Sequence, residues 1–135
     1  MKKTIDEILA MEKVEPRRAH GNEESRLQIA CVRWFRMQYP KLANLLFSVP
    51  NGAKRSRVTG AILKAEGAMP GVSDLILLYP SGGTPYLCIE MKTEKGRQSD
   101  AQKEFQAAVQ GVGGRYELVR TFEAFVELVK GYLGN

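Results

Sequence analysis

The sequence predicts one α/β domain, with a mixed central sheet and helices on both of its faces. Helical and strand-like segments alternate along most of the 135 residues, and this order is typical of a sheet covered by helices. Residues 75–79 are apolar at every position, as expected of a strand buried on both faces. With 44% apolar and 26% charged residues, the composition is that of an ordinary globular domain and argues against global disorder.

The first 22 residues are predicted to form an arm outside the main domain, which covers residues 23–135. Within the arm, Ile5, Ile8 and Leu9 line one face of a short helix. The segment 16–22 ends this helix, because it contains a proline and a glycine, which interrupt helices. The arm is expected either to fray or to pack on a partner subunit.

The elements of the main domain are predicted from hydrophobic spacing and from turn residues. Leu27, Cys31 and Trp34, for example, recur at helical spacing, and the helix that they indicate ends before Pro40 because a residue preceding proline disfavours helical backbone. The predicted elements, in order, are a helix at 23–39, a strand at 45–49, a helix at 57–66, strands at 73–79 and 86–92, a helix from Ser99 to Val112, a strand at 116–119 and a helix from Thr121 or Phe122 to Leu133.

The charge of the chain indicates an anionic partner. The net charge is +5, and the excess lies in residues 1–67, so nucleic acid is the first candidate. Cys31 and Cys88 are not spaced as metal ligands and are predicted to be core thiols of a reducing cytoplasm. No apolar run reaches membrane-spanning length, and acids interrupt any signal-peptide core. We therefore expect a cytoplasmic protein without a membrane partner.

The most informative segment runs from Gly71 to Lys92. Asp74 opens an apolar run, a turn follows, and a second run ends in Glu90-Met91-Lys92. Alternation along a strand puts Glu90 and Lys92 on one face and Met91 on the other. If the two runs pair as a hairpin, two carboxylates and one amine meet at one point of the sheet.

Glu90 requires a cation, because a glutamate inside a covered strand is costly without one. Lys92 is one such cation, and a structural Glu90–Lys92 pair is the simpler interpretation. Asp74, however, adds a second acid, and two acids with one lysine leave a surplus negative charge. The surplus favours Mg²⁺ or Mn²⁺, bound by Asp74, Glu90 and the backbone carbonyl of Met91. Lys92 is then expected to orient the attacking water or to stabilise charge on a phosphate. No organic cofactor is predicted.

Several ordered blocks of the sequence extend this pattern. The spacing from Asp74 to Glu90-Met91-Lys92 resembles the PD-(D/E)xK nuclease pattern, which alone is weak. Together with further blocks, the chain from about Glu23 to Leu133 resembles the VRR-NUC family of that superfamily, in the form of a standalone phage-type member. Those blocks are Ser48–Gly52, Lys64–Gly67, Pro70–Leu75, Ile89–Thr93 and Lys95–Ser99 through Gln102. Ser73 is a departure, because the superfamily name places proline before the acid.

The resemblance implies the fold, dependence on a divalent metal and cleavage of DNA. It also implies a third acid on the first helix of the domain, for which Glu24 is preferred and Glu23 is the rival that spacing does not separate. Gln102 resembles the family's glutamine after the Glu-X-Lys strand. Gln102 could equally well cap the helix that starts at Ser99, because Ser99–Gln102 matches a capping box.

DNA contacts are predicted in the basic first half. Lys54, Arg55 and Arg57 form the densest basic cluster, suited to sequence-independent binding of the phosphate backbone. Asn51 lies in a loop that the family places near its site. The resemblance also implies a homodimer acting on branched DNA such as Holliday junctions.

Two other functions remain alternatives at this stage. One is a non-catalytic DNA-binding module on a nuclease fold, which binds DNA without metal. The other is a structural charge network in an unrelated α/β protein, which binds neither metal nor DNA. Asp74, Glu90 and Lys92 together favour the endonuclease over both.

Overall fold

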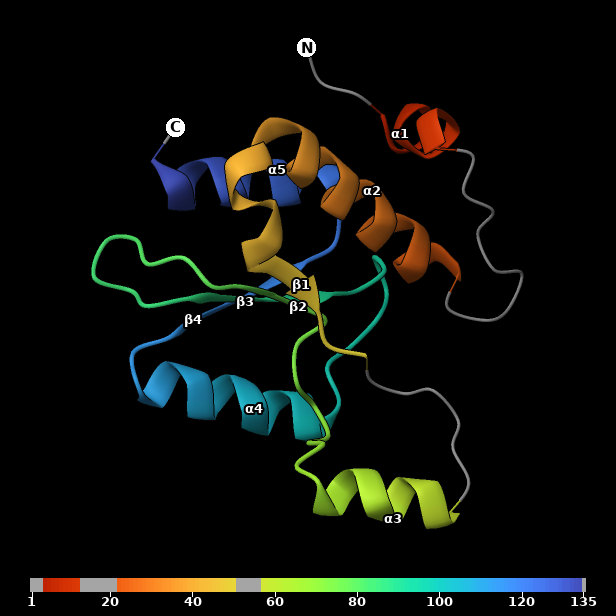
Figure 1. The fold of residues 1–135 in the computed structure, drawn as a ribbon, viewed down its shortest axis with the longest axis vertical. Helices are drawn as coiled ribbons and strands as arrows, with labels where there is room; N and C mark the ends of the chain where they lie inside the picture. The colour runs from red at the N-terminus through yellow and green to blue at the C-terminus, as the bar shows by residue number, and fades with distance from the viewer. Residues whose placement is uncertain (1–3, 13–21, 51–56, 135) are drawn as a thin grey trace.

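A four-stranded mixed sheet, ordered β1-β2-β3-β4, lies at the centre of the molecule (Figure 1). The structure is a computed structural model and describes residues 4–12, 22–50 and 57–134. The first three strands pair antiparallel, and β3 and β4 pair parallel, so the predicted mixed sheet is confirmed. The strands are β1 (Leu46–Ser48), β2 (Leu75–Leu77), β3 (Leu87–Met91) and β4 (Arg115–Val119).

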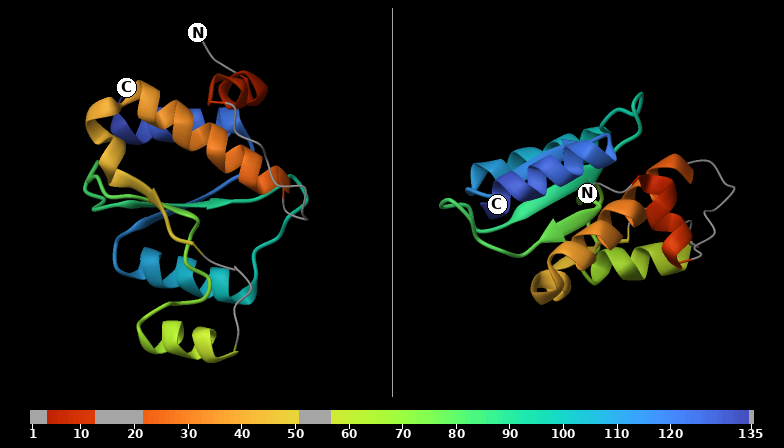
Figure 2. Two further views of the ribbon diagram at one scale, coloured as in Figure 1. Left: turned by 45° about the vertical axis from the view of Figure 1, so that its right-hand side comes forward. Right: turned by 90° about the horizontal axis from the view of Figure 1, so that it is seen from above.

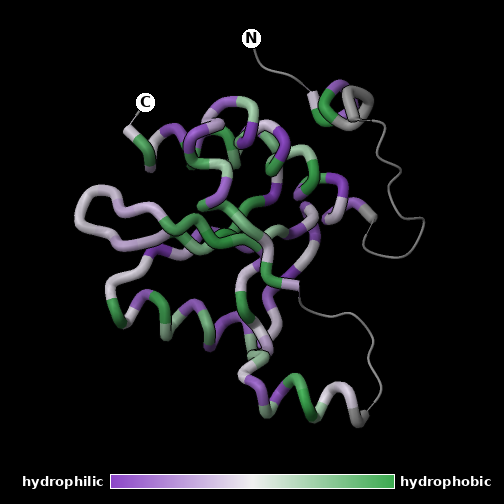
Figure 3. The backbone as a smooth tube through the Cα atoms, in the orientation of Figure 1, coloured by the Kyte–Doolittle hydropathy of each residue, from purple (hydrophilic) through white to green (hydrophobic). Residues whose placement is uncertain are grey.

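Helices cover both faces of this sheet, as predicted. Figure 2 shows α2 (Asn22–Gln38) and α5 (Phe122–Leu133) over one face and α4 (Asp100–Gly111) over the other. The larger core lies between the sheet, α2 and α5, while a smaller one under α4 contains Cys88, Val109 and Tyr116. Figure 3 shows hydrophobic residues along the central strands, which separate the two cores. Each face of the sheet is therefore buried by a different part of the chain.

Most of the predicted elements occur where the sequence indicated them. The helix at 23–39 is α2, followed by the 3-10 helix η1 (Pro40–Leu45), and the helix at 57–66 is α3 (Arg57–Ala65). The last helix begins at Phe122, because the Thr121 side chain accepts a hydrogen bond from the Ala124 N–H at 3.0 Å and caps it. Cys31 and Cys88 are buried free thiols, as expected.

The prediction that residues 75–79 are buried throughout is wrong at its end. Leu75 and Leu77 are fully buried, but Leu78 is 51% exposed. The strand ends at Leu77, and the chain then enters the β2–β3 loop, where Ser81 and Thr84 exchange two backbone hydrogen bonds across Gly82-Gly83. Leu78 therefore lies beyond the region that α2, α4 and α5 cover.

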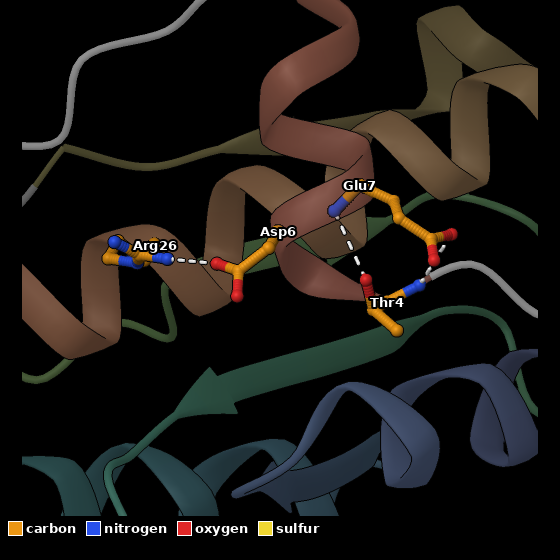
Figure 4. Close-up of polar contacts among 4 residues, drawn as sticks. All are labelled: Thr4, Asp6, Glu7 and Arg26. Atoms are coloured by element: carbon orange, nitrogen blue, oxygen red, sulfur yellow. Dashed lines mark hydrogen bonds and ion pairs between the residues drawn. The ribbon is translucent and has the colours of Figure 1, made fainter.

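The helix predicted in the N-terminal arm is present as α1 (Ile5–Glu12) and packs on α2. Figure 4 shows Thr4 and Glu7 bonded to each other's backbone N–H, which is a capping box, and Asp6 paired with Arg26 of α2. Ile8 is fully buried in the larger core. Residues 4–12 thus contact the main domain of their own chain, while residues 13–21 lie outside the described residues. The boundary at residue 22 stays a prediction.

No helix within the described ranges is long and apolar enough to cross a membrane.

Gly71 fits the turn before β2 closely against the first turn of α4. Its φ is +84°, and a Cβ at this position would lie 2.2 Å from the carbonyl oxygen of Ala101. Gly71→Ala should therefore lower the free energy of unfolding by about 2 kcal/mol or more, as left-handed strain adds to a backbone clash. Chemical denaturation measures this loss. Gly82→Ala is the matched control, because Gly82 has φ +59° and open space around it; an equal loss there would contradict the packing argument.

Candidate active site

Asp74 and Glu90 lie opposite each other at the ends of two paired strands. Leu75 pairs with Ile89 in the antiparallel register of β2 and β3. Asp74 precedes Leu75 and Glu90 follows Ile89, so these two acids face each other across the strands. The Met91 N–H donates a 2.7 Å hydrogen bond to Asp74 Oδ2. The Asp74 carbonyl accepts from the Val49 N–H at 3.0 Å. The backbone of three strands therefore positions this acid.

Glu90 is the buried acid of the pair, at 2% exposed. Burial, followed by the neighbouring Asp74 carboxylate, raises the pKa of its carboxyl from 4.5 to about 8. Lys92 and the Tyr116 hydroxyl act in the opposite direction. Tyr116 donates to Glu90 Oε1 at 3.4 Å, and Gln102 Nε2 donates to Glu90 Oε2 at 2.9 Å. Both carboxylate oxygens are thus held in place.

Gln102 has both of the roles that the sequence left as alternatives. Its Oε1 accepts from the Ser99 N–H at 2.8 Å, and the Ser99 hydroxyl oxygen accepts from the Gln102 N–H at 3.1 Å, which completes the capping box of α4. Its amide nitrogen remains available for Glu90. The cap therefore fixes the orientation in which Gln102 meets the acid.

Gln102→Glu separates these two roles. Glutamate retains the oxygen that caps α4, but it loses the N–H donor and puts a third acid beside Glu90. We expect a melting temperature close to wild type and, for the DNA cleavage that the resemblance implies, a rate lower by about tenfold or more. Ser99→Ala is the converse variant, with about 1 kcal/mol less stability and faster cleavage than Gln102→Glu. Equal rates of DNA cleavage in the two variants would contradict a direct role of the Gln102 amide.

Lys92 continues β3 beyond Glu90 and Met91. Its N–H donates to the Val119 carbonyl at 3.0 Å, which fixes the backbone against β4. Among the described residues, its side chain forms no ion pair with Glu90, so the simpler interpretation of a structural Glu90–Lys92 pair is not realised. Its positive charge still lowers the pKa values of Glu90 and Glu24. The half-buried Lys92 side chain is therefore close enough to act on the site.

Glu24 lies beside Asp74, whereas Glu23 is exposed. Glu24, Asp74 and residues of β1 line one pocket of about 440 Å³ between α2 and the edge of the sheet. Burial raises the pKa of Glu24, Lys92 lowers it and Asp74 raises it. The helical spacing did not separate these two acids, because only the packing of α2 on the sheet decides which of them faces Asp74.

Three residues that the sequence analysis missed support the site. Tyr116, on β4, contacts Glu90, and Gln98 donates to the Tyr116 hydroxyl at 3.2 Å. Arg120 donates through one nitrogen to the carbonyls of Thr93 and Gly96, both at 2.7 Å, and so holds the loop after Lys92. Since these contacts depend on the parallel register of β3 and β4, no local sequence pattern could indicate them.

The predicted DNA contacts are only partly described. Asn51, Lys54 and Arg55 lie outside the described residues, and Arg57 is the first residue of α3. Their role in binding DNA stays a prediction.

The donor set suits a divalent cation. No group of three or more His, Cys, Asp or Glu in the described part of the chain could hold a metal ion. The predicted ligands are the carboxylates of Asp74 and Glu90, the Met91 carbonyl and, from α2, Glu24. The first three already give the oxygen donors that Mg²⁺ prefers, with water completing the shell. Within a strand, the N–H and C=O of one residue point to the same side, so the Met91 carbonyl points toward β2, as its N–H does. A cation there would offset the cost of ionising Glu90 beside Asp74, so the residues fit.

The fold is that of a nuclease domain, as comparisons with known proteins show. The family model described as VRR-NUC domain matches residues 18–123. A solved structure described as a VRR_NUC domain protein is 22% identical, with a TM-score of 0.72 over 82% of this chain and 88% of that chain. No curated protein matches the chain.

The chain belongs to the VRR-NUC domain family. This is a nuclease family, whose activity is hydrolysis of phosphodiester bonds and whose partner is DNA. Nucleases of the PD-(D/E)xK type generally use a divalent metal.

Proposed function

We propose that this chain is a Mg²⁺- or Mn²⁺-dependent endonuclease that cuts branched DNA. The observation that carries the proposal is the opposition of Asp74 and Glu90 across β2 and β3, with Lys92 two residues beyond Glu90. A buried carboxyl whose pKa is raised to about 8 is costly to keep unless it works with a cation. A purely structural network would have paired Glu90 with Lys92.

Each residue has a defined task in this reaction. Asp74, Glu90 and the Met91 carbonyl would hold the metal, Glu24 adds a further negative charge beside Asp74, and Gln102 and Tyr116 hold the Glu90 carboxylate. These residues would hold a divalent cation that would supply polarisation of the phosphodiester and a water nucleophilic at neutral pH. The Lys92 ammonium orients the attacking water or stabilises the negative charge that develops on the phosphate.

A homodimer is part of the proposal, because two sites can then act on the two strands of a branch. Exposed apolar side chains support it: Ile62 of α3 and Met69, in the turn that follows, are 53% and 60% exposed. A second copy could cover them. Light scattering that finds only monomer at assay concentrations would remove the dimer from the proposal.

One cleavage experiment tests the function. Labelled four-way junction, 5′ flap and linear duplex are incubated with Mg²⁺, Mn²⁺ or EDTA, using wild type and Asp74→Ala. We expect cleavage of branched substrates only with metal, and none by the variant. Cleavage that persists in EDTA or in Asp74→Ala sinks the metal mechanism. DNA binding without cleavage under every condition would instead favour the non-catalytic module.

A further inference from the structure

The pocket beside the candidate active site extends well beyond the acids. One stripe of α2 forms its wall, and the edge strand β1 forms the opposite side. The stripe begins with Glu24 and ends with Arg36, residues whose separation along a helix is about 18 Å. The pocket is therefore elongated, and only one of its ends belongs to the catalytic residues.

The chemistry changes along this length. Glu24 and Asp74 form the acidic end, Ile29, Val32 and Leu46 line the middle, and Arg33 and Arg36 lie at the basic end. An acidic end suits a metal and the phosphate to be cut, while an arginine suits a second phosphate. An apolar middle suits a sugar or base between the two. This order fits one strand of nucleic acid that enters from the basic end.

Strand β1 adds a backbone donor to the same pocket. Val49 donates to Asp74 and Leu78 donates to the Leu45 carbonyl, so in this antiparallel ladder the residues bonded to β2 are 45, 47 and 49. The N–H of Ser48 therefore points away from β2, on the outer edge of the sheet. Backbone N–H groups and hydroxyls such as that of Ser48 are common phosphate donors.

The size of the pocket favours single-stranded over double-stranded DNA. Its volume of about 440 Å³ is in the range of small-ligand pockets. A volume of this size suits a short stretch of one strand better than a duplex, whose major groove alone is about 12 Å wide.

We propose that the groove between α2 and β1 binds an unpaired DNA strand next to the bond that is cut, and that Arg36 contacts a phosphate of this strand. The inference rests on the proposed function only in taking the acidic end as the active site. It makes Arg36 a specificity residue: substrates with an unpaired strand at the branch, such as flaps, are bound better than fully paired duplex or junction arms.

Binding without metal tests this directly. Fluorescence anisotropy in EDTA measures the affinity of labelled (dT)12 and of a 12-base-pair duplex over a series of salt concentrations. Arg36→Ala should weaken (dT)12 binding by about tenfold and reduce the slope of log K against log salt by about 0.7, the value for one phosphate contact to a single strand. Lys130→Ala, which removes an exposed charge on α5, should change the slope less.

A second variant blocks the groove without touching its charges. Gln28 is half-buried, lines the pocket and lies outside the two core clusters, so Gln28→Trp should fill the groove and weaken (dT)12 binding more than duplex binding. Circular dichroism confirms that both variants fold. An unchanged slope in Arg36→Ala, or full (dT)12 affinity in folded Gln28→Trp, overturns the proposal.

The two proposals fail in different ways. If wild type cuts DNA with metal but Arg36→Ala binds (dT)12 normally, the endonuclease stands and the strand groove is wrong. If Arg36→Ala loses (dT)12 binding but wild type cuts no substrate with Mg²⁺ or Mn²⁺, the groove stands and the proposed function is wrong.

Discussion

Lys92→Ala should slow DNA cleavage by about 10²- to 10³-fold and leave the protein folded. The reason is electrostatic: among the residues that act on the pKa values of Glu90 and Glu24, Lys92 is the positive charge. An acidic site that receives a phosphate loses a large share of transition-state stabilisation when such a donor is removed. Single-turnover cleavage at saturating Mg²⁺ measures the effect on the chemical step.

The control for this prediction is Lys130→Ala, which removes the same charge from an exposed position on α5. It should cleave within a fewfold of wild type. If Lys92→Ala also stayed within about tenfold of wild type, Lys92 would have no part in the chemistry. Its position after Glu90 would then be explained by the backbone bond to Val119 alone.

Glu90→Gln should abolish cleavage and stabilise the metal-free protein at high pH. The folded-state pKa of Glu90, about 8, lies above its ordinary value of 4.5, so the folded protein holds this proton more tightly than the unfolded chain. The contribution of this group is therefore most favourable below about pH 4.5 and is lost as the pH rises to 8. Glutamine at position 90 resembles the protonated carboxyl and stays neutral, so the variant does not lose stability as the pH rises.

The measurement is thermal unfolding at pH 5 and pH 9, in EDTA and in Mg²⁺. In EDTA at pH 9 the variant should exceed wild type by an amount on the order of a few kcal/mol, whereas at pH 5 the two should be similar. Mg²⁺ should stabilise wild type but not the variant, because binding to the folded state alone raises stability. A variant less stable than wild type at pH 9 would show that the buried carboxylate is already balanced by its protein partners.

Both predictions concern a site that, without its metal, lowers the stability of the folded protein. Glu90 is buried and ionises with difficulty, while Gln102 and Tyr116 hold its oxygens ready. Metal binding should therefore release a proton and grow stronger as the pH approaches 8. The burial of Glu90 lowers the stability of the metal-free protein. The same burial, together with the contacts to Gln102 and Tyr116, holds the carboxylate in position for catalysis.

Local sequence patterns predicted the elements well because local energies govern them. The capping box at Ser99 and Gln102 and the cap at Thr121 start helices where the sequence indicated. The run at 75–79 was less reliable, since the exposure of Leu78 depends on where the neighbouring strands and helices stop. The capping box of Thr4 and Glu7 is equally local, because both residues lie within one helical turn.

In the candidate site, too, some relations between residues follow from local sequence and others only from tertiary packing. The sequence by itself determined that Asp74, Glu90 and Lys92 share one hairpin end, because alternation and chain connectivity are local. Only the tertiary structure decided that Glu24 rather than Glu23 faces Asp74 and that Tyr116 meets Glu90. It also placed Arg36 and the acids in one groove. Those relations depend on how α2 packs on the sheet and on the register between β3 and β4, which arise from the burial of whole faces and not from any short pattern.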